Sequence, residues 1–360
     1  MSEDWNKING QLQAVMDDEV ANNRECGCQL VIYQHGEKVV DLCAGYTAPD
    51  KKEAITRNHL FPIFSCGKAV LATAALQGLD KGYYTLNTPI PDIWKGFEVN
   101  GKGDITIEHV LSHRSGLQAL PPMKEHRELA NWELMCNGIE NATPATPAGK
   151  VCAYHGTTFA FTVGRPLEIA DGRPLQKIIT QEIFEKCGIE KDFYFGVDAD
   201  AEKRVVDIVD APDIEVRPTW NSKTMNDPVF RRTCAPSYNG CASANGLARF
   251  YAGLAGDLPG VQLLKPETFA LATSCHRRDP EDPVTECWTR FGLGIVLWGM
   301  GEAEPGILIG HGGASGSEGY YFREKGLAVG FVKNLSIKNH PHHIVRDRIA
   351  EILGVPVRHW

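Results

Sequence analysis

The amino-acid sequence predicts an α+β fold, in which an antiparallel β-sheet flanked by N- and C-terminal helices carries an inserted, mostly helical lobe. Three observations predict this fold. Segments with strand character lie near both ends of the 360 residues, segments with helical periodicity lie between them, and a further helix is predicted at each end. Joining both ends of the chain in one sheet is the most economical way to bury their apolar faces.

The N-terminal part of the chain contains a predicted helix and a predicted hairpin. Apolar residues recur at helical spacing from Trp5 to Val20, which predicts a helix there. Two apolar stretches, Cys28–Tyr33 and Lys38–Leu42, flank a turn at Gly36 and predict a pair of antiparallel strands. The chain is therefore expected to begin with one helix and two strands of the sheet.

The rest of the chain is predicted as helices followed by strands. Helical periodicity predicts three helices in the middle, at Ala69–Leu79, Leu175–Cys187 and Leu247–Leu254. Apolar stretches bounded by turn residues predict four strands near the C-terminus, at Phe291–Trp298, Ile307–Gly310, Gly319–Phe322 and Leu327–Val332. A closing helix is predicted over Ile344–Leu353, which Gly354 and Pro356 end.

We expect these elements to form one domain over residues 1–360. Its sheet lobe is expected to comprise residues 1–62 and 285–360, and its helical lobe residues 63–284. A chain of this length buries a large hydrophobic core. The cleft between two such lobes is a natural place for a small-molecule site.

Charge and composition bear on the partners of the protein. Lys and Arg total 37 and Asp and Glu total 45, so the formal net charge is −8, which argues against nucleic acid or an anionic membrane as a partner. No apolar run approaches the ~18 residues that a transmembrane helix needs. The polar N-terminus does not resemble a secretory signal. These features predict a cytoplasmic protein with a small-molecule partner, and they do not indicate an oligomeric state.

The cysteines and histidines favour neither disulfides nor a metal site. The chain has 11 cysteines, an odd number, which is typical of reduced thiols in a cytoplasmic protein. Two local groups, Cys26 with Cys28 and His340 with His342 and His343, lack the spacing of a structural zinc site. We therefore expect no metal, and nothing in the sequence calls for an organic cofactor.

The strongest local signal for chemistry is the segment from Phe61 to Lys68, which leads into a predicted helix. Ser65 and Lys68 are three residues apart, a spacing that places two side chains on one helix face. A serine hydroxyl becomes a good nucleophile when a neighbouring base takes its proton, and burial lowers the pKa of a lysine so that it can act as that base. Ser and Lys also occur at this spacing by chance, and a capping serine is then the commoner explanation.

Two later segments strengthen the catalytic interpretation. Tyr154 lies in a loop that enters an apolar segment, where its phenol is a candidate second proton carrier, in part as a phenolate beside Lys68, although a lone tyrosine is usually a core anchor. His311, Gly312 and Gly313 end a predicted strand, and glycines let the backbone approach a ligand closely. A backbone N–H there is a candidate oxyanion donor. Otherwise this segment is a glycine-rich strand end with an incidental histidine.

The order and spacing of these three segments resembles the serine β-lactamase-like hydrolases, in particular class C β-lactamases, family VIII carboxylesterases and penicillin-binding proteins. The Ser-x-x-K pattern is a nucleophile motif of this superfamily. Three further segments also resemble it: residues 106–117, residues 242–251 and Asn334. The resemblance covers nearly the whole chain and implies a β-lactamase/transpeptidase-like fold.

The resemblance also implies a role for each candidate residue. Ser65 matches the acylated nucleophile, Lys68 its helix partner and Tyr154 the tyrosine general base. His311, Gly312 and Gly313 match the Lys-Thr-Gly strand motif that contacts substrate. The backbone N–H groups of Ser65 and Ala314 match the oxyanion hole.

The sequence departs from the penicillin-recognising members at two positions. Gly156 stands where they usually have the asparagine that contacts the substrate amide, and His311 stands where they have a lysine that binds the substrate carboxylate. A histidine is only partly charged near neutral pH. Both changes are compatible with the esterase branch, whose members often have His or Trp in place of that lysine.

We therefore expect a serine hydrolase that cleaves a small ester through a covalent acyl-enzyme on Ser65. Four alternatives stay open: a β-lactamase, a D-amino-acid peptidase or amidase, an acyltransferase, and a non-catalytic binding module on the same scaffold. The sequence contains neither the G-x-S-x-G elbow of α/β-hydrolases nor the H-E-x-x-H motif of zinc proteases. Trp132, Trp220 and Tyr238 are candidate pocket residues, although isolated aromatic residues more often serve in packing.

Overall fold

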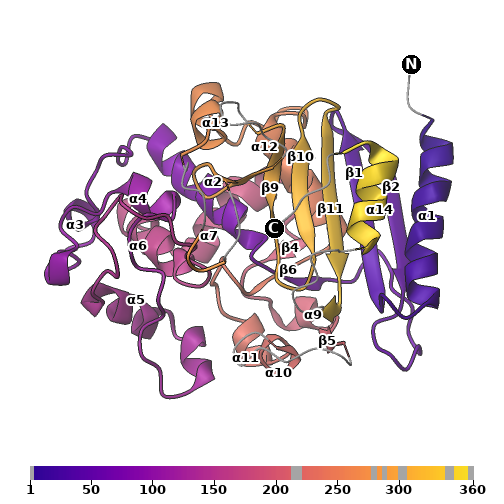
Figure 1. Ribbon diagram of the computed structural model, residues 1–360, viewed down its shortest axis with the longest axis horizontal. Helices are drawn as coiled ribbons and strands as arrows, with labels where there is room; N and C mark the ends of the chain where they lie inside the picture. The colour runs from indigo at the N-terminus through magenta and orange to yellow at the C-terminus, as the bar shows by residue number, and fades with distance from the viewer. Residues whose placement is uncertain are drawn as a thin grey trace.

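The central feature of the fold is an antiparallel sheet built from both ends of the chain (Figure 1). The computed structural model describes residues 4–211, 221–276, 282–285, 290–298, 306–336 and 344–355. Within these ranges the sheet has seven strands in the order β2-β1-β11-β10-β9-β8-β7. Their bounds are β1 (Gly27–Gln34), β2 (Glu37–Gly45), β7 (Arg290–Phe291), β8 (Val296–Trp298), β9 (Leu308–Gly312), β10 (Glu318–Phe322) and β11 (Leu327–Lys333). The predicted joining of N- and C-terminal strands is thus confirmed, because β1 pairs with β11.

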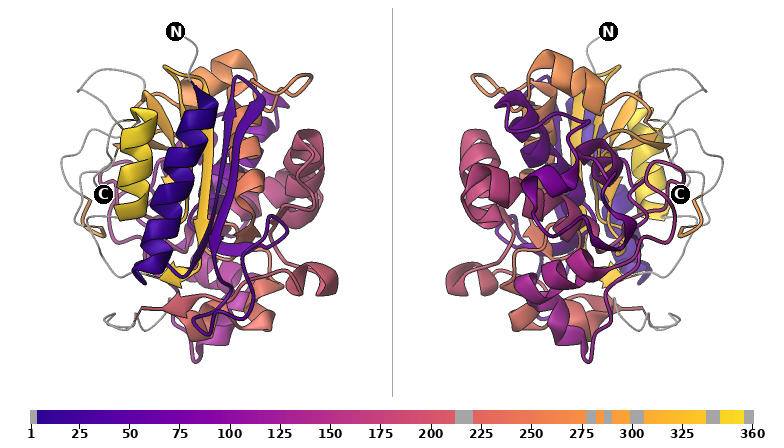
Figure 2. Two further views of the ribbon diagram at one scale, coloured as in Figure 1. Left: turned by 90° about the vertical axis from the view of Figure 1, so that its right-hand side faces the viewer. Right: turned by 90° about the vertical axis from the view of Figure 1, so that its left-hand side faces the viewer.

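Two terminal helices cover one face of this sheet, α1 (Trp5–Ala21) and α14 (Ile344–Leu353). Figure 2 shows them side by side. Leu12 and Met16 of α1 are fully buried and belong to one apolar cluster with Ile32, Val329 and Ile349. The alternation of strand side chains places one apolar set of each strand on this face. This first core therefore consists of the two chain ends and the sheet between them.

The opposite face of the sheet packs mainly against α12 (Ala244–Ala255), and the described residues contain eleven further α-helices besides α1 and α14. These are α2 (Gly67–Asp80), α3 (Ile90–Ile93), α4 (Ile107–Leu111), α5 (Trp132–Asn141), α6 (Phe159–Asp171), α7 (Leu175–Ile179), α8 (Glu185–Cys187), α9 (Ala199–Glu202), α10 (Ser222–Met225), α11 (Pro228–Arg231) and α13 (Pro266–Ala272). Short 3-10 turns span Val99–Gly101 and His126–Ala130. Residues from these helices form a second and larger core.

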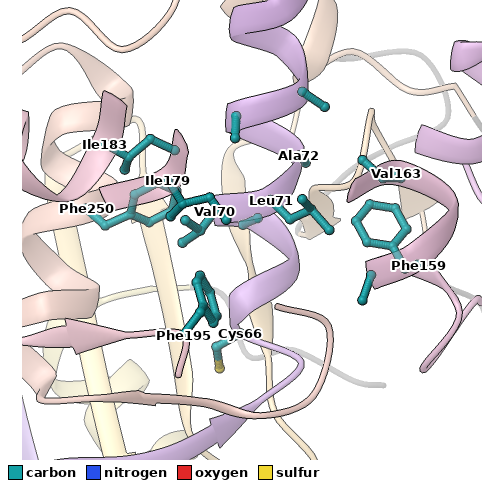
Figure 3. Packing of buried hydrophobic residues seen from close by; sticks show 14 of the residues in the cluster. Cys66, Val70, Leu71, Ala72, Phe159, Val163, Ile179, Ile183, Phe195 and Phe250 are labelled. Atoms are coloured by element: carbon teal, nitrogen blue, oxygen red, sulfur yellow. The ribbon is translucent and has the colours of Figure 1, made fainter. Parts of the chain in front are cut away.

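Helix α2 passes through the middle of the second core. Every residue from Gly67 to Gly78 is buried, as expected for a helix that is mostly apolar around its whole circumference. Figure 3 shows Val70 with Ile179, Ile183 and Phe250 on one side of α2, and Leu71 with Phe159 and Val163 on the other. The residues that begin this helix are therefore held from several directions at once.

Five short strands of the described ranges lie outside the main sheet. Strand β3 (Phe61–Phe64) pairs with β6 (Gly240–Ala242), which pairs with β4 (Phe193–Tyr194). Strands β5 (Val209–Asp210) and β12 (Leu335–Ser336) form a parallel pair. The three-stranded sheet matters for the site because β3 leads directly into α2.

Two predicted elements were wrong in detail. The strand predicted over Phe291–Trp298 is two short strands, because Gly294 adopts a left-handed conformation and the Gly292 N–H bonds to the Ile295 carbonyl, which folds the segment into a hairpin. The helix predicted over Leu175–Cys187 is interrupted by a π-helical turn at Thr180–Phe184. Helices α4, α5 and α6 and the three-stranded sheet were not predicted.

Leu71 provides a test of how far stability depends on the packing of α2. Its side chain has no exposed surface, so Leu71→Ala is expected to lower the free energy of unfolding by about 2–5 kcal/mol. Leu134 is 41% exposed, so Leu134→Ala is expected to change the free energy of unfolding by no more than about 0.5 kcal/mol. Urea denaturation followed by circular dichroism measures both. Equal losses in the two variants would contradict the packing described for α2.

Candidate active site

Ser65 lies in the turn between β3 and α2. The helix begins at Gly67, so the serine precedes the helix rather than lying on its face, and the Lys68 N–H bonds to the Ser65 carbonyl at 3.0 Å. Phe64 has a φ of +49°, a conformation that costs a non-glycine residue roughly 1–2 kcal/mol. Its side chain is buried, and this packing holds the turn in place. Ser65 itself is partly exposed and accessible to a substrate.

The structure brings Ser65, Lys68 and Tyr154 together. Lys68 Nζ lies 2.9 Å from Ser65 Oγ, and the Tyr154 hydroxyl donates to Ser65 Oγ, also at 2.9 Å. Lys68 Nζ donates a further hydrogen bond to the carbonyl of Ser237 at 2.7 Å, and it lies 5.0 Å from the centroid of the Tyr154 ring. The hydroxyl, the amine and the phenol therefore form one connected network.

Burial controls the protonation of this network. The Lys68 side chain has no exposed surface, and loss of hydration lowers its pKa well below the ordinary value of 10.5. Burial also raises the pKa of the Tyr154 hydroxyl above its ordinary value of 10.0, an effect larger than the opposing one of the hydrogen bond to Ser65. Burial thus favours the neutral forms of both the amine and the phenol. The phenolate considered from the sequence is not favoured here.

The backbone and the ring of Tyr154 are both held by groups that sequence reasoning missed. The carboxylate of Asp282 is fully buried and accepts from the Tyr154 N–H at 3.0 and 3.2 Å. The ring of His113 lies 5.1 Å from the Tyr154 ring, and Phe291 stacks on it at 5.9 Å. These groups come from segments far apart in the chain, so no local pattern identifies them as neighbours of the tyrosine.

A second histidine is held next to Tyr154. His155 lies 2.6 Å from the Ala153 carbonyl through Nδ1 and 2.6 Å from Ser115 Oγ through Nε2. Because a carbonyl only accepts, Nδ1 carries the proton and the Ser115 hydroxyl donates to Nε2. Burial lowers the pKa of His155 to about 4, so the ring is neutral near pH 7. Ser115 lies in the segment that the sequence analysis singled out, and its contact with His155 gives that segment a structural role.

His311 lies at the end of β9, facing the network. Its ring is 6.2 Å from the Tyr154 ring, and its Nδ1 donates to the Gly312 carbonyl at 2.8 Å. Burial lowers the pKa of His311 to about 3. The sequence suggested a partly charged histidine near neutrality, but this burial keeps the ring uncharged there. His311 is therefore poorly suited to replace a lysine as a carboxylate partner.

The glycines that follow His311 bring β9 against the turn that holds Ser65. A methyl group added to Gly313 would overlap the carbonyl oxygen of Ile63 and would lie 3.4 Å from Cys66 Sγ. The Gly313 N–H bonds to the Ser317 carbonyl at 2.7 Å, which closes a tight turn around the exposed Ala314. The backbone after Gly313 thus passes close to the nucleophile turn.

The candidate pocket aromatics act as packing residues where they are described. Tyr238 is buried and donates its hydroxyl to the Leu129 carbonyl at 2.9 Å. Trp132 donates its ring N–H to Glu168 and packs against Phe161. Trp220 lies outside the described residues, as do the three histidines at 340, 342 and 343. In the described ranges no group of three or more His, Cys, Asp or Glu residues is arranged to hold a metal ion.

Comparison with known proteins identifies the family of this chain. A model of the family described as Beta-lactamase matches residues 12–354. The chain belongs to the Beta-lactamase family. In agreement with this, it is 25% identical to Esterase/beta-lactamase LipL of Mycobacterium tuberculosis, over 90% of this chain and 83% of that protein.

Solved structures share the fold of this Beta-lactamase family member. A family VIII carboxylesterase superposes with a TM-score of 0.87 at 22% identity and 96% coverage of both chains. A penicillin-binding protein homologue from Caulobacter crescentus superposes with a TM-score of 0.84 at 25% identity, again over 96% of each chain. The predicted fold class and the predicted membership of the serine hydrolases of this family are thus confirmed.

The buried amine predicts a specific dependence of stability on pH. The pKa of Lys68 is lower in the folded protein than the 10.5 of the unfolded chain. Between the folded pKa and 10.5 the unfolded chain therefore binds more protons than the folded protein. In that pH range the free energy of unfolding of the wild type rises with pH. Lys68→Met removes this contribution. The stability of the variant relative to wild type is therefore expected to fall as pH approaches 10.5, which thermal denaturation over a pH series measures. A pH-independent difference would contradict the buried neutral amine.

Proposed function

We propose that this serine hydrolase cleaves a small ester through a covalent acyl-enzyme formed on Ser65. One observation carries the proposal: the Ser65 hydroxyl contacts a fully buried lysine amine and a phenol, each at 2.9 Å. A serine needs such a neighbouring base to attack a carbonyl. The names of LipL and of the family VIII carboxylesterase, both of which refer to esterases, give further support.

In the first half of the proposed reaction, Ser65 attacks the ester carbonyl and its proton passes to the neutral amine of Lys68. Tyr154, as a neutral phenol, then donates its proton to the alkoxide as the bond between the carbonyl carbon and the leaving oxygen breaks. The Lys68 ammonium returns a proton to the Tyr154 phenolate, which restores both groups. The shared contact with Ser65 Oγ supports this path, because each proton moves between groups already in or near hydrogen-bond contact.

The second half of the reaction releases the acid. Water attacks the acyl carbonyl and gives up its proton to the Lys68–Tyr154 pair, and Ser65 recovers a proton as it leaves. In both halves the negative oxygen of the tetrahedral intermediate would be held by the backbone N–H groups of Ser65 and Ala314. The close approach of Gly313 to Ile63 supports this oxyanion hole.

A neutral ester fits the site better than an anionic β-lactam. His311, Gly312 and Gly313 would line the substrate side of β9, and the buried His311 offers no charge for a carboxylate. Gly156 offers no side chain to a substrate amide. A lost hydrogen bond to a charged group costs about 1.5–3 kcal/mol, or roughly ten- to a hundred-fold in rate if the transition state makes it.

We further propose one catalytic domain that works in the cytoplasm. The ten cysteines in the described part of the chain are free thiols, which supports a reducing compartment. No described helix combines the length and apolar character of a membrane span. We also propose that this domain is divided into a sheet lobe and a helical lobe. Helix α12, which comes from the middle of the chain, packs on the sheet and so connects the two lobes.

The nucleophile is tested by Ser65→Ala. We expect a loss of at least ~10³-fold in kcat on a chromogenic ester, because the covalent step is removed from a coupled group of residues. The melting temperature is expected to stay close to that of wild type, since the serine is partly exposed. Retention of a substantial fraction of the activity would exclude Ser65 as the nucleophile.

The substrate class is tested by comparing short acyl esters with a chromogenic cephalosporin over a pH series. Esters are expected to be much the better substrates. The pKa of His311 is about 3, so cephalosporin turnover is expected not to improve relative to ester turnover between about pH 8 and about pH 5. A cephalosporin rate that matches the best ester, or that rises as His311 would gain charge, would favour the β-lactamase alternative.

A further inference from the structure

Ser237 joins the two sides of the proton network. Its carbonyl accepts from Lys68 Nζ at 2.7 Å, and its hydroxyl donates to the Thr157 carbonyl at 2.6 Å. The same hydroxyl accepts from the Ala160 N–H at 3.2 Å. Thr157 follows Tyr154 by three residues, so one fully buried serine contacts both the lysine and the segment that carries the tyrosine.

The hydroxyl also completes the start of α6. The first N–H groups of a helix have no partner within the helix, and Thr158, which precedes α6, provides no side-chain cap. Ala160 lies in this first turn, and its N–H bonds to Ser237 Oγ at 3.2 Å as well as to the Thr157 carbonyl at 3.3 Å. The position of α6, and of the Tyr154 segment that precedes it, is therefore linked to the position of Ser237.

The backbone around Ser237 is fixed at both ends of its turn. Asn239 donates to the carbonyls of Phe230 and Thr233 and accepts from the Ala235 N–H at 3.0 Å. A methyl group on Gly67 would overlap the carbonyl oxygen of Pro236, so this turn lies directly against the first turn of α2. The Ser237 carbonyl is thus held at a set distance from the helix that carries Lys68.

We infer that Ser237 is a positioning residue for the proposed serine hydrolysis: its hydroxyl sets the distance between the Lys68 amine and Tyr154. The inference rests on the proposed function. A neutral amine has two N–H groups and one lone pair. When one N–H is held by the Ser237 carbonyl, the orientation of the lone pair toward Ser65 Oγ is restricted. The hydroxyl, through its bonds to Thr157 and Ala160, fixes the position of this carbonyl relative to the phenol of Tyr154.

The experiment measures how fast a fluorophosphonate probe labels Ser65, which requires no knowledge of the natural substrate. In Ser237→Ala the limiting labelling rate is expected to fall by about 10- to 100-fold, because a small displacement of a catalytic base has effects of this size. The probe concentration that gives half the limiting rate is expected to stay the same, since the substitution removes only the hydroxyl, whose partners are Thr157 and Ala160. Mass spectrometry of the labelled peptide confirms that Ser65 is the site.

Ser243→Ala is the matched control. Ser243 is equally buried, accepts from the Gly246 N–H at the start of α12 and donates to Asp192. It lies outside the proton network, so its loss is expected to lower stability and leave the labelling rate unchanged. Equal slowing in both variants would show a general structural effect and overturn the inference.

The remaining outcomes separate this inference from the proposed function. Wild-type labelling at Ser65, lost in Ser65→Ala, combined with a wild-type rate in Ser237→Ala, would overturn the role of Ser237 alone. Absence of labelling in wild type would overturn both. If Ser237→Ala does not fold, Ser237→Cys replaces it, because a thiol has a similar shape and only a weak hydrogen bond. Its rate is expected to fall below that of wild type, and an equal rate would contradict the inference.

Discussion

The burial of the Lys68 amine is the constraint on which the rest of the site depends. An amine removed from water keeps its charge only at high cost, and a carboxylate beside it would restore that charge. The hydrogen-bond partners of Lys68 are instead a serine hydroxyl and a backbone carbonyl, both uncharged. The buried carboxylate of Asp282 accepts from the backbone N–H of Tyr154. The surroundings of Lys68 therefore favour its neutral form, which can act as a base.

The fold meets this constraint by placing the start of α2 between two layers. The helix is surrounded by apolar side chains, which exclude water from Lys68, while the turn before it leaves Ser65 partly exposed. A strained residue, Phe64, marks the point where the buried strand gives way to this turn. Strain of this kind persists only where the surrounding structure is well packed. The well-packed core around α2 thus compensates for the unfavourable backbone conformation of Phe64, just before the helix.

Local sequence patterns predicted those parts of the molecule that depend on interactions between residues close together in the chain. The terminal helices and the strands of the main sheet have clear periodicity, and Ser65 with Lys68 lie close together because they are three residues apart. Asp282 and Ser237 were missed, because their contacts depend on segments that meet only in the folded chain. The uncharged state of His311 was missed for the same reason: its burial comes from the surrounding elements, and no neighbour in sequence indicates it.

The pairing of β1 with β11 has a consequence for how the chain acquires its structure during synthesis. Cys28 pairs with Lys333, which is 333 − 28 = 305 residues further along the chain, so this pairing has to wait until β11 has been synthesised. Until then the N-terminal hairpin has an open strand edge, which is a template for association with other chains. Non-local pairing of this kind also slows folding. Newly made chains thus carry an unpaired edge of β1, and with it a risk of aggregation, until β11 emerges.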